Sequence, residues 1–310
     1  MSEKKRYRLV TRSDMDGLVC AVLLKEIDLI DDIIFVHPKD MQDGTIRLTA
    51  DDITTNLPFN KIVHICFDHH ASEALRNEKQ DNHIIITDAP SAARVVYDYY
   101  GGKEVFHNIS EDMMVAVDKA DAAQFSKDDI LNPKGWDLLS FLMDSRTGLG
   151  RFREFRVSNY TLMMDLIDYC KDHDIKDIMQ LPDVKERVEL YESYEQKAIN
   201  QIKENTTVYK NLAVLDLRDV EIIYPTNRFT IYALYEQCNI SLHIIWGLKK
   251  QNTVFAVGGS IINRSSKTNV GELMLSYGGG GHEAAGTCQV DNDKAENSLK
   301  EIIEKINANG

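Results

Sequence analysis

Acidic and imidazole side chains follow three predicted strands within the first 70 residues. Asp14-Met15-Asp16-Gly17 follows YRLVTR, Asp51-Asp52 follows TIRLTA, and Asp68-His69-His70 follows KIVHICF. Burying such side chains in a core is costly unless each finds a partner. We therefore interpret Asp68-His69-His70 as a functional group. For Asp14 alone a turn or helix cap is an equally good reading, and only one residue of the pair 51–52 is expected to be functional.

Two further carboxylates, Asp118 and Asp121, follow in the stretch AVDKADAAQF. So many like charges close together require cations. Carboxylate oxygens with a few imidazoles suit Mn²⁺, Mg²⁺ or Fe²⁺ better than zinc. Because carboxylates flanking metal ions activate water for attack on phosphorus, this pattern predicts a metal-dependent hydrolase of phosphate esters.

A glycine run, Gly278–Gly281, precedes His282 in the stretch SYGGGGHEAAGTCQV. Four consecutive glycines are entropically costly and need a backbone reason. Exposed amides of such a loop can cradle an anion, whereas the alternative is a flexible linker. Arg264, shortly upstream, is a candidate phosphate ligand because its guanidinium forks onto phosphate oxygens.

The elements that must position the acidic residues alternate between strands and helices. We expect strands at 7–12, 32–37, 61–68 and 82–88, with a further strand ending at 51–52, and helices at 17–30, 91–102 and 110–121. This alternation predicts a largely parallel α/β sheet. In such a sheet the carboxyl ends of the strands share one edge, where ligand clefts form.

The second half of the chain changes character. Residues 137–205 show helical patterns without strands, after which strand patterns resume up to 291, interrupted by a helix at 228–238 and followed by a last helix. We predict three parts: an N-terminal α/β domain over 1–182 with a mostly parallel sheet flanked by helices, a connecting helix over 183–205, and a smaller C-terminal α/β domain over 206–310.

The composition limits the function classes. The chain has 310 residues, a formal net charge of −13, and five scattered cysteines without a Cys-x-x-Cys pair. A net charge of this sign disfavours binding to long nucleic acid, but not to a short anion held by metal ions. No apolar run approaches the roughly 20 residues that a membrane span needs. We therefore expect a cytoplasmic protein with no membrane or long nucleic-acid partner, its cysteines mostly buried.

The order of these motifs resembles that of the DHH phosphoesterase superfamily with its C-terminal DHH-associated domain. The motifs are Asp14-x-Asp16-Gly17, an aspartate near 52, Asp68-His69-His70, and Gly278–Gly281 with His282. The resemblance spans almost the whole chain. That family includes RecJ-type exonucleases, nano-RNases that also dephosphorylate pAp, cyclic-dinucleotide phosphodiesterases and exopolyphosphatases. The resemblance implies a cofactor of two Mn²⁺ ions, with Mg²⁺ or another divalent ion as the alternative.

The resemblance also implies roles for the residues that match its motifs. Asp14 and Asp16 would each bind one metal, bridged by Asp52, with Asp51 as the lesser choice for the bridge. The fourth-motif ligand would be Asp121 or Asp118, of which we prefer Asp121.

In the Asp-His-His motif, His69 would bind metal, His70 would face the phosphate as a catalytic group, and Asp68 would orient them. The C-terminal domain would hold the substrate with His282 and Arg264. The glycine ligands implied there are Gly279, Gly280 and Gly281.

The chain departs from the family just before Asp14. Many relatives carry a histidine there, but this chain has Val10-Thr11-Arg12-Ser13. Either the first metal site is weaker and is completed from elsewhere, or Arg12 contacts a phosphate and one metal suffices.

Short oligonucleotides, linear dinucleotides and pAp are the expected substrates, and Tyr277 is the candidate for base stacking. Inorganic polyphosphate is the enzymatic alternative, for which Arg12, Lys39, Arg94 and Arg264 are candidate ligands. A phosphate-binding protein without turnover is the non-enzymatic alternative. A homodimer is compatible with the resemblance, since many such two-domain enzymes pair.

Overall fold

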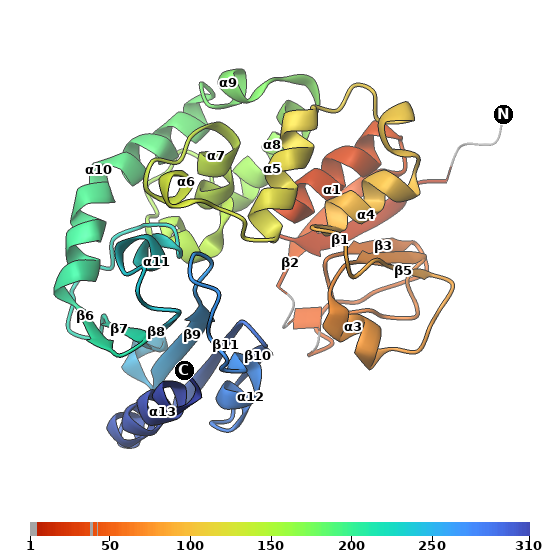
Figure 1. Cartoon of the computed structure of the whole chain (residues 1–310). Helices are drawn as coiled ribbons and strands as arrows, with labels where there is room; N and C mark the ends of the chain where they lie inside the picture. The colour runs from red at the N-terminus through yellow and green to blue at the C-terminus, as the bar shows by residue number, and fades with distance from the viewer. Residues whose placement is uncertain (1–4, 38–39, 42) are drawn as a thin grey trace. The chain divides into compact units, whose positions relative to one another are not determined.

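The computed structural model describes residues 5–37, 40–41 and 43–310, and the chain divides into two compact units (Figure 1). The first unit comprises residues up to Gln124 and Pro133–Leu190, and the second comprises Phe125–Asn132 and Tyr191–Gly310. The long helix expected near 183–205 is α10 (Pro182–Glu204), which begins in the first unit and ends in the second.

The first unit contains a five-stranded parallel sheet in the order β2-β1-β3-β4-β5, which confirms the expected fold class. Its strands are β1 (Tyr7–Arg12), β2 (Ile30–Val36), β3 (Asp52–Thr55), β4 (Ile65–Asp68) and β5 (His83–Ile85). Its helices are α1 (Met15–Glu26), α3 (Ala71–Arg76), α4 (Ala92–Tyr99), α5 (Glu111–Asp121), α7 (Gly135–Met143), α8 (Asn159–Asp172) and α9 (Ile175–Ile178). Three short 3-10 turns are η1 (Gly102–Glu104), η2 (Ser145–Thr147) and η3 (Leu149–Arg151).

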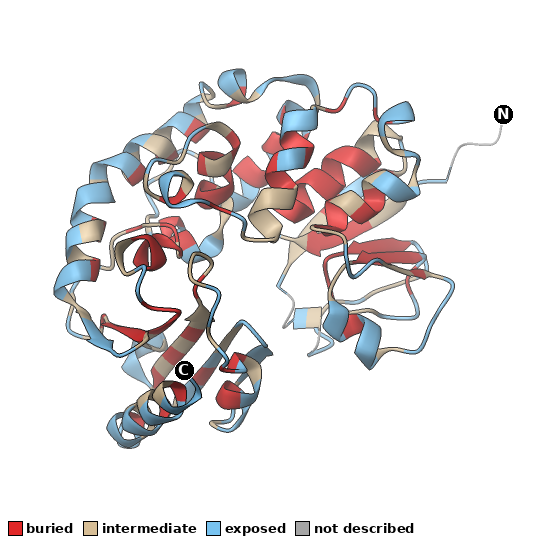
Figure 2. Cartoon of the chain, viewed as in Figure 1, coloured by how far each residue is buried: buried red, intermediate tan, exposed pale blue. Residues whose placement is uncertain are grey.

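Helix α1 lies at the centre of the first core and contacts α4, α5 and α8. Figure 2 shows it almost entirely in the colour of buried residues. Two residues separate it from β1, and the second of them, Asp14, caps it by accepting a hydrogen bond from the Gly17 amide. A Cβ at Gly17 would lie 1.9 Å from the carbonyl oxygen of Arg12. Only glycine allows this tight strand-to-helix turn, which sets the acidic motif at the end of β1.

One strand assignment from the sequence is wrong. Residues 45–51 form no strand, and β3 begins at Asp52 instead of ending there. The four residues DITT of β3 are all buried, between β1 and β4, so the strand carries no polar alternation that would mark its start. Its carboxyl end is therefore followed by Asn56, not by an aspartate.

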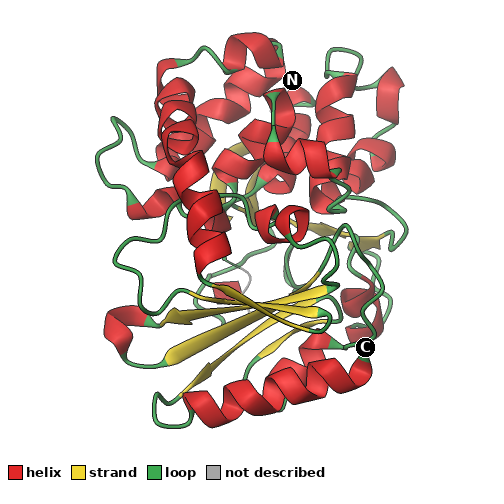
Figure 3. Cartoon of the chain, turned by 60° about the vertical axis from the view of Figure 1, so that its left-hand side comes forward, coloured by secondary structure: helices red, strands yellow, loops and turns green. Residues whose placement is uncertain are grey.

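The second unit contains a six-stranded mixed sheet in the order β10-β11-β9-β8-β7-β6, in which only the pair β7–β8 is parallel. Its strands are β6 (Thr206–Tyr209), β7 (Leu212–Asp216), β8 (Ile240–Trp246), β9 (Thr253–Gly259), β10 (Gly280–His282) and β11 (Ala285–Val290). Its helices are α6 (Lys127–Leu131), α11 (Thr230–Leu234), α12 (Val270–Leu275) and α13 (Ala295–Asn309), with the 3-10 turn η4 (Leu248–Lys250). Figure 3 shows α13 lying along this sheet, where Ile302 and Ile306 are fully buried.

All five cysteines are free and buried, as expected from their scatter. Within the described ranges, no helix combines the length and the apolar character that crossing a membrane requires.

Candidate functional site

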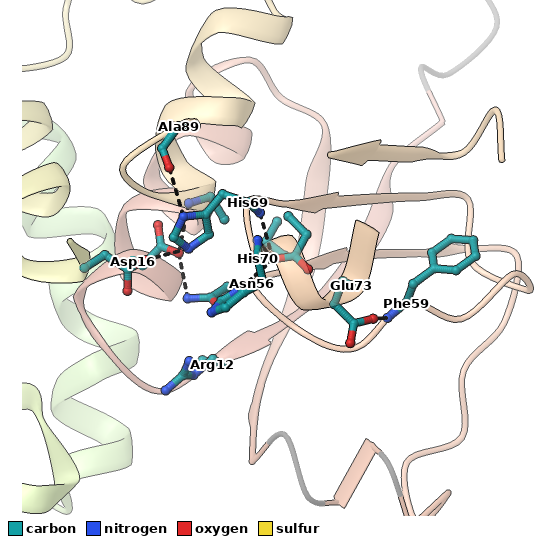
Figure 4. Close-up of polar contacts among 12 residues, drawn as sticks. Arg12, Asp16, Asn56, Phe59, His69, His70, Glu73 and Ala89 are labelled. Carbon is teal, nitrogen blue, oxygen red and sulfur yellow. Dashed lines mark hydrogen bonds and ion pairs between the residues drawn. The ribbon is translucent and has the colours of Figure 1, made fainter. Parts of the chain in front are cut away.

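Polar side chains meet at the carboxyl edge of the first sheet. β3 is followed by Asn56, β4 ends at Asp68 and is followed by His69, and Asp16 stands in the first turn of α1. Figure 4 shows Asp16, Asn56 and His69 converging. The edge predicted from parallel strand order is thus where these groups gather.

Three side chains at this edge have the composition of a cation site. Asp16, His69 and Asp121 each offer one ligand atom, and these atoms all lie within 4.8 Å of one another. The buried Nε2 atom of His69 lies 2.7 Å from Oδ2 of Asp121. Two carboxylates and one imidazole directed at one point fit a divalent ion of the Mn²⁺ or Mg²⁺ type.

The backbone fixes the orientation of His69. Its Nδ1 lies 3.0 Å from the carbonyl oxygen of Ala89, a contact in which Nδ1–H donates, so Nε2 faces Asp16 and Asp121. Burial lowers the pKa of His69, but the two carboxylates outweigh it and raise the pKa to about 9. Without a cation, a proton on His69 therefore balances part of the negative charge.

Asp16 is only 1% exposed and depends on donors from two other elements. Its Oδ1 accepts from the amide of Ala93 at 2.7 Å, and its Oδ2 accepts from the amide of Ala92 at 3.2 Å and from Nδ2 of Asn56 at 2.7 Å. Burial, together with Asp121 and Asp14, raises its pKa well above the usual range. This carboxylate is thus positioned rigidly at a point where negative charge is unfavourable unless a cation is present.

Asn56 is a site residue that the sequence analysis missed. It is 2% exposed and adopts a φ of 54°, and its amide donates to the carbonyl oxygen of Phe67 on β4. Its Nδ2 holds Asp16, while its Oδ1 is buried without a hydrogen-bond partner among the described residues. The signal in the sequence was the polar residue that follows the β-branched run Ile53-Thr54-Thr55, which the misplaced strand end concealed.

Asp14 and Arg12 form an ion pair beside this cluster. Nε of Arg12 lies 3.1 Å from Oδ2 of Asp14, whose Oδ1 accepts from Gly17. Burial raises the pKa of Asp14, and the guanidinium opposes that shift. The pKa of Arg12 is itself raised, chiefly by Asp14 and further by Asp121 and Asp16, so its positive charge is secure.

A second arginine–aspartate pair follows α7 and was also missed. Asp144 caps η2, and its Oδ1 accepts from Nε of Arg146 at 2.7 Å. The charge of Asp144 helps to raise the pKa of Arg12, and the charge of Arg146 acts to lower the pKa of Asp14. The pair therefore contributes to the electrostatics of Arg12 and Asp14.

Asp68 and His70 form a separate hydrogen-bonded pair. Asp68 is fully buried, and its Oδ1 lies 2.8 Å from Nδ1 of His70 and accepts from the amide of His69. His70 precedes α3 with its side chain 42% exposed. The ring is thus held at Nδ1, and Oδ2 of Asp68 is buried without a hydrogen-bond partner within the described residues.

The structure does not bring Asp52 to this edge. Asp52 begins β3, opposite Arg8, at the other end of the sheet. Its oxygens accept from Nε of Arg8 at 2.6 Å, from Nη2 of Arg8 at 2.9 Å and from the amide of Thr49 at 2.6 Å. The alternative, Asp51, is exposed and pairs with Lys5 at 2.8 Å. Neither residue occupies the bridging place, because the strand starts where the sequence pattern suggested that it ends.

Between the two fourth-motif choices, Asp121 is the one in the cluster. Asp118 instead accepts from Oγ of Ser91 at 2.8 Å and from Arg94 at 3.0 and 2.5 Å. Arg94 is therefore engaged within the first unit. Lys39 lies outside the described residues.

In the second unit, the glycine run forms part of the edge strand β10. Cβ atoms at Gly279 and Gly281 would lie 2.0 and 2.2 Å from carbonyl oxygens of β11, so close strand pairing alone requires glycine there. Gly280 and His282 are exposed, and Nδ1 of His282 accepts from the amide of Ala284 at 3.2 Å.

Arg264 is exposed, with Nε donating to the carbonyl oxygen of Ile261 at 3.2 Å. Tyr277 contacts Glu301 and Lys305.

A solved structure of high sequence identity is similar to this chain over nearly its whole length. It is the pGpG-specific phosphodiesterase PggH from Vibrio cholerae, with 58% sequence identity and a TM-score of 0.86. The match covers 98% of this chain and 100% of that one.

A more distant similarity is to RecJ from Thermus thermophilus. Its structure with Mn²⁺ has 13% identity and a TM-score of 0.54, covering 98% of this chain and 52% of that one. Its structure with Mg²⁺ has a TM-score of 0.51. These matches concern the fold. No family model matches the chain, and no curated protein does.

Proposed function

The chain belongs to the DHH phosphoesterase superfamily and is a phosphohydrolase, and on that premise we propose that it cleaves linear dinucleotides such as pGpG, with a divalent cation held by Asp16, His69 and Asp121. The observation that carries this proposal is the convergence of these three ligand atoms in a chain so similar to a pGpG-specific phosphodiesterase. We propose Mn²⁺ as the ion, since a mixed set of carboxylate and imidazole suits it. The coarser conclusion, a small phosphorylated substrate, follows from the same similarity.

When bound, a divalent cation at this point would supply an activated water and stabilise negative charge on the phosphoryl group. The protein supplies orientation. Ala89 holds His69 with Nε2 toward the ion site, and Asn56 with the α4 amides holds Asp16. Because these supports are backbone or buried groups, the ligands need little rearrangement before the reaction.

We assign proton transfer to His70. Asp68 holds its Nδ1 side at 2.8 Å and so fixes the orientation of the ring. This leaves Nε2 as the atom that can pass a proton to the oxygen leaving the phosphorus. Its partly exposed ring is compatible with a substrate reaching it.

We assign substrate holding in the second unit to Arg264, His282 and the glycines 279–281. Residues 206–310 would be the substrate-binding domain and residues 1–182 the metal-binding domain. Exposure of Arg264 and His282 supports this assignment. Arg264→Ala is expected to raise KM for a dinucleotide and to leave bound metal unchanged. An unchanged KM would remove Arg264 from the site.

The test is turnover of pGpG, pApA, pAp and medium-chain polyphosphate, each with Mn²⁺, Mg²⁺ or chelator. We expect pGpG and one water to give two GMP in the presence of the ion and nothing in chelator. His69→Ala should be inactive, whereas His173→Ala, a change at an exposed surface histidine, should match the unaltered protein. Turnover of polyphosphate alone would replace the proposal with an exopolyphosphatase, and binding without product would replace it with a sensor.

A further inference from the structure

We propose that this enzyme binds a single divalent cation, at Asp16, His69 and Asp121, and that Arg12 supplies the second positive charge of the centre. This inference rests on the proposed function and departs from the two-ion centre that the family resemblance implies. It concerns how many ions the chain holds and which side chain replaces the missing one.

The first ion position has three protein ligands, two of which are held by other groups. Its three ligand atoms come from α1, the end of β4 and the end of α5. Asp16 and His69 are each held by buried or backbone partners, namely Asn56, the α4 amides and the Ala89 carbonyl. The buried Nε2 of His69 faces the carboxylate of Asp121 at 2.7 Å, an arrangement that a cation between the two ligands would satisfy.

The second ion position lacks its ligands. Between Tyr7 and Asp14 the chain contains no histidine, and Asp14 is outside both groups of potential ligands found among the described residues. The other such group, Asp68 with His69 and His70, shares His69 with the first position, and its Asp68 Oδ1 already accepts from His70.

The bridging position is also changed. At the carboxyl end of β3, where a carboxylate could join two ions, stands Asn56, whose Nδ2 donates to Oδ2 of Asp16 at 2.7 Å. An amide in this orientation presents its N–H to the carboxylate and blocks that oxygen from a second ion. Asp52, the carboxylate expected there, is held by Arg8 at the opposite end of β3.

Arg12 has the position and charge to replace the second ion. Its guanidinium pairs with Asp14 at 3.1 Å, and its side chain is 28% exposed. Within the described residues its side chain makes this ion pair and no hydrogen bond, so its outer nitrogens are available to fork onto phosphate oxygens. The charges also balance: one divalent cation and one guanidinium match the carboxylates of Asp14, Asp16 and Asp121.

The test counts ions independently of turnover. Mn²⁺ bound per chain would be measured by equilibrium dialysis with elemental analysis, and spin coupling between ions by electron paramagnetic resonance. We expect about one uncoupled Mn²⁺ per chain, lost in His69→Ala and retained in Arg12→Ala. Two coupled ions per unaltered chain, or none, would overturn the inference.

A gain-of-site variant tests the cause. Arg12→His combined with Asn56→Asp supplies the imidazole and the bridging carboxylate, and it is expected to bind two ions with a coupled spectrum. Circular dichroism and thermal unfolding would verify that the double variant is folded. If the folded double variant still binds one ion, Arg12 and Asn56 are not what excludes the second ion. Arg6→Ala, which removes an arginine paired with Asp28 before β1, is the matched control.

Turnover then separates the two proposals. Arg12→Ala should lower kcat for pGpG by about 100-fold, as removal of one charge-stabilising donor does, with partial recovery in Arg12→Lys. One ion per chain with no turnover of any dinucleotide would refute the proposed substrate and leave the ion count supported. Full turnover by Arg12→Ala would overturn the role of Arg12.

Discussion

Replacing Asp52 distinguishes the position expected from the sequence from the position observed in the structure. If Asp52 bridged metal ions, Asp52→Asn would abolish ion binding and turnover. In the structure Asp52 pairs with Arg8, whereas the last pair of β1 and β3, at the carboxyl edge, is Thr11 with Thr55. Asp52 is therefore three residues away from that edge. At about 3.3 Å per residue this is roughly 10 Å from the carboxyl edge of the sheet.

The expected loss is therefore one of stability. The Asp52 carboxylate is 1% exposed and accepts from Arg8 twice and from the Thr49 amide. If an asparagine places its carbonyl oxygen where Oδ2 of Asp52 lies, it keeps the bonds from Nη2 of Arg8 and from the Thr49 amide. Its NH₂ group then faces Nε of Arg8, so this one charge-assisted bond, worth about 2 kcal/mol, is lost. Asp52→Ala removes the acceptor of Nε of Arg8 and of the Thr49 amide. It should cost about 3 kcal/mol, toward the low end for buried pairs because the Arg8 side chain is 30% exposed.

Urea unfolding at 25 °C would measure these losses, beside Mn²⁺ binding and pGpG turnover under conditions where each variant is folded. Asp16→Asn serves as the comparison, because it should lose ion binding and turnover. An Asp52→Asn protein with unaltered unfolding free energy and no bound Mn²⁺ would refute the assignment of Asp52 to the far end of the sheet.

Three further predictions follow from the same structure. Asp121→Asn should remove Mn²⁺ binding, whereas Asp118→Asn should leave Mn²⁺ binding intact and lower stability, because it loses its ion pair with Arg94. Calorimetric titration of both variants with Mn²⁺ measures the difference. Equal loss of Mn²⁺ binding in the two variants would contradict this distinction. Gly17→Ala should cost about 3 kcal/mol in urea unfolding, because its Cβ would overlap the Arg12 carbonyl oxygen; an unfolding free energy equal to that of the parent protein would exclude that contact. Burial lowers the pKa of His243 on β8 to about 4, so the unfolded chain binds more protons below pH 6.5 and stability should fall as the pH drops from about 6.5 toward 4. His243→Gln should flatten this part of the urea-midpoint profile, and a profile as steep as that of the parent would assign the acid sensitivity to other groups.

Much of the first unit could be predicted because its signals are local. Apolar strands alternating with helices require a parallel sheet, and parallel strands must end at one edge. The motif at β4 is a clear case: an apolar strand that ends in Asp68 and is followed by two histidines had to place polar groups at that edge.

The error at Asp52 shows where local pattern is insufficient. DITT is a fully buried central strand of four residues, so hydrophobicity alone does not mark its ends. Parallel pairing with β1 sets its register, with Arg8 opposite Asp52, and so makes Asn56 the residue at the edge. An error of a few residues in where a strand ends therefore changes which residue is expected at the edge, here Asp52 instead of Asn56.

The sequence by itself determined the residue types: carboxylates, imidazoles and an arginine where a histidine was expected, spaced to follow strands of an α/β unit. These follow from chain-local chemistry. Only the tertiary structure decided which carboxylates share a point in space, namely Asp16 and Asp121 with His69, while Asp118 and Asp52 pair with arginines elsewhere. The physical reason is that a ligand set depends on distances between segments far apart in the chain. Those distances are fixed by sheet register and helix packing, which no single segment encodes.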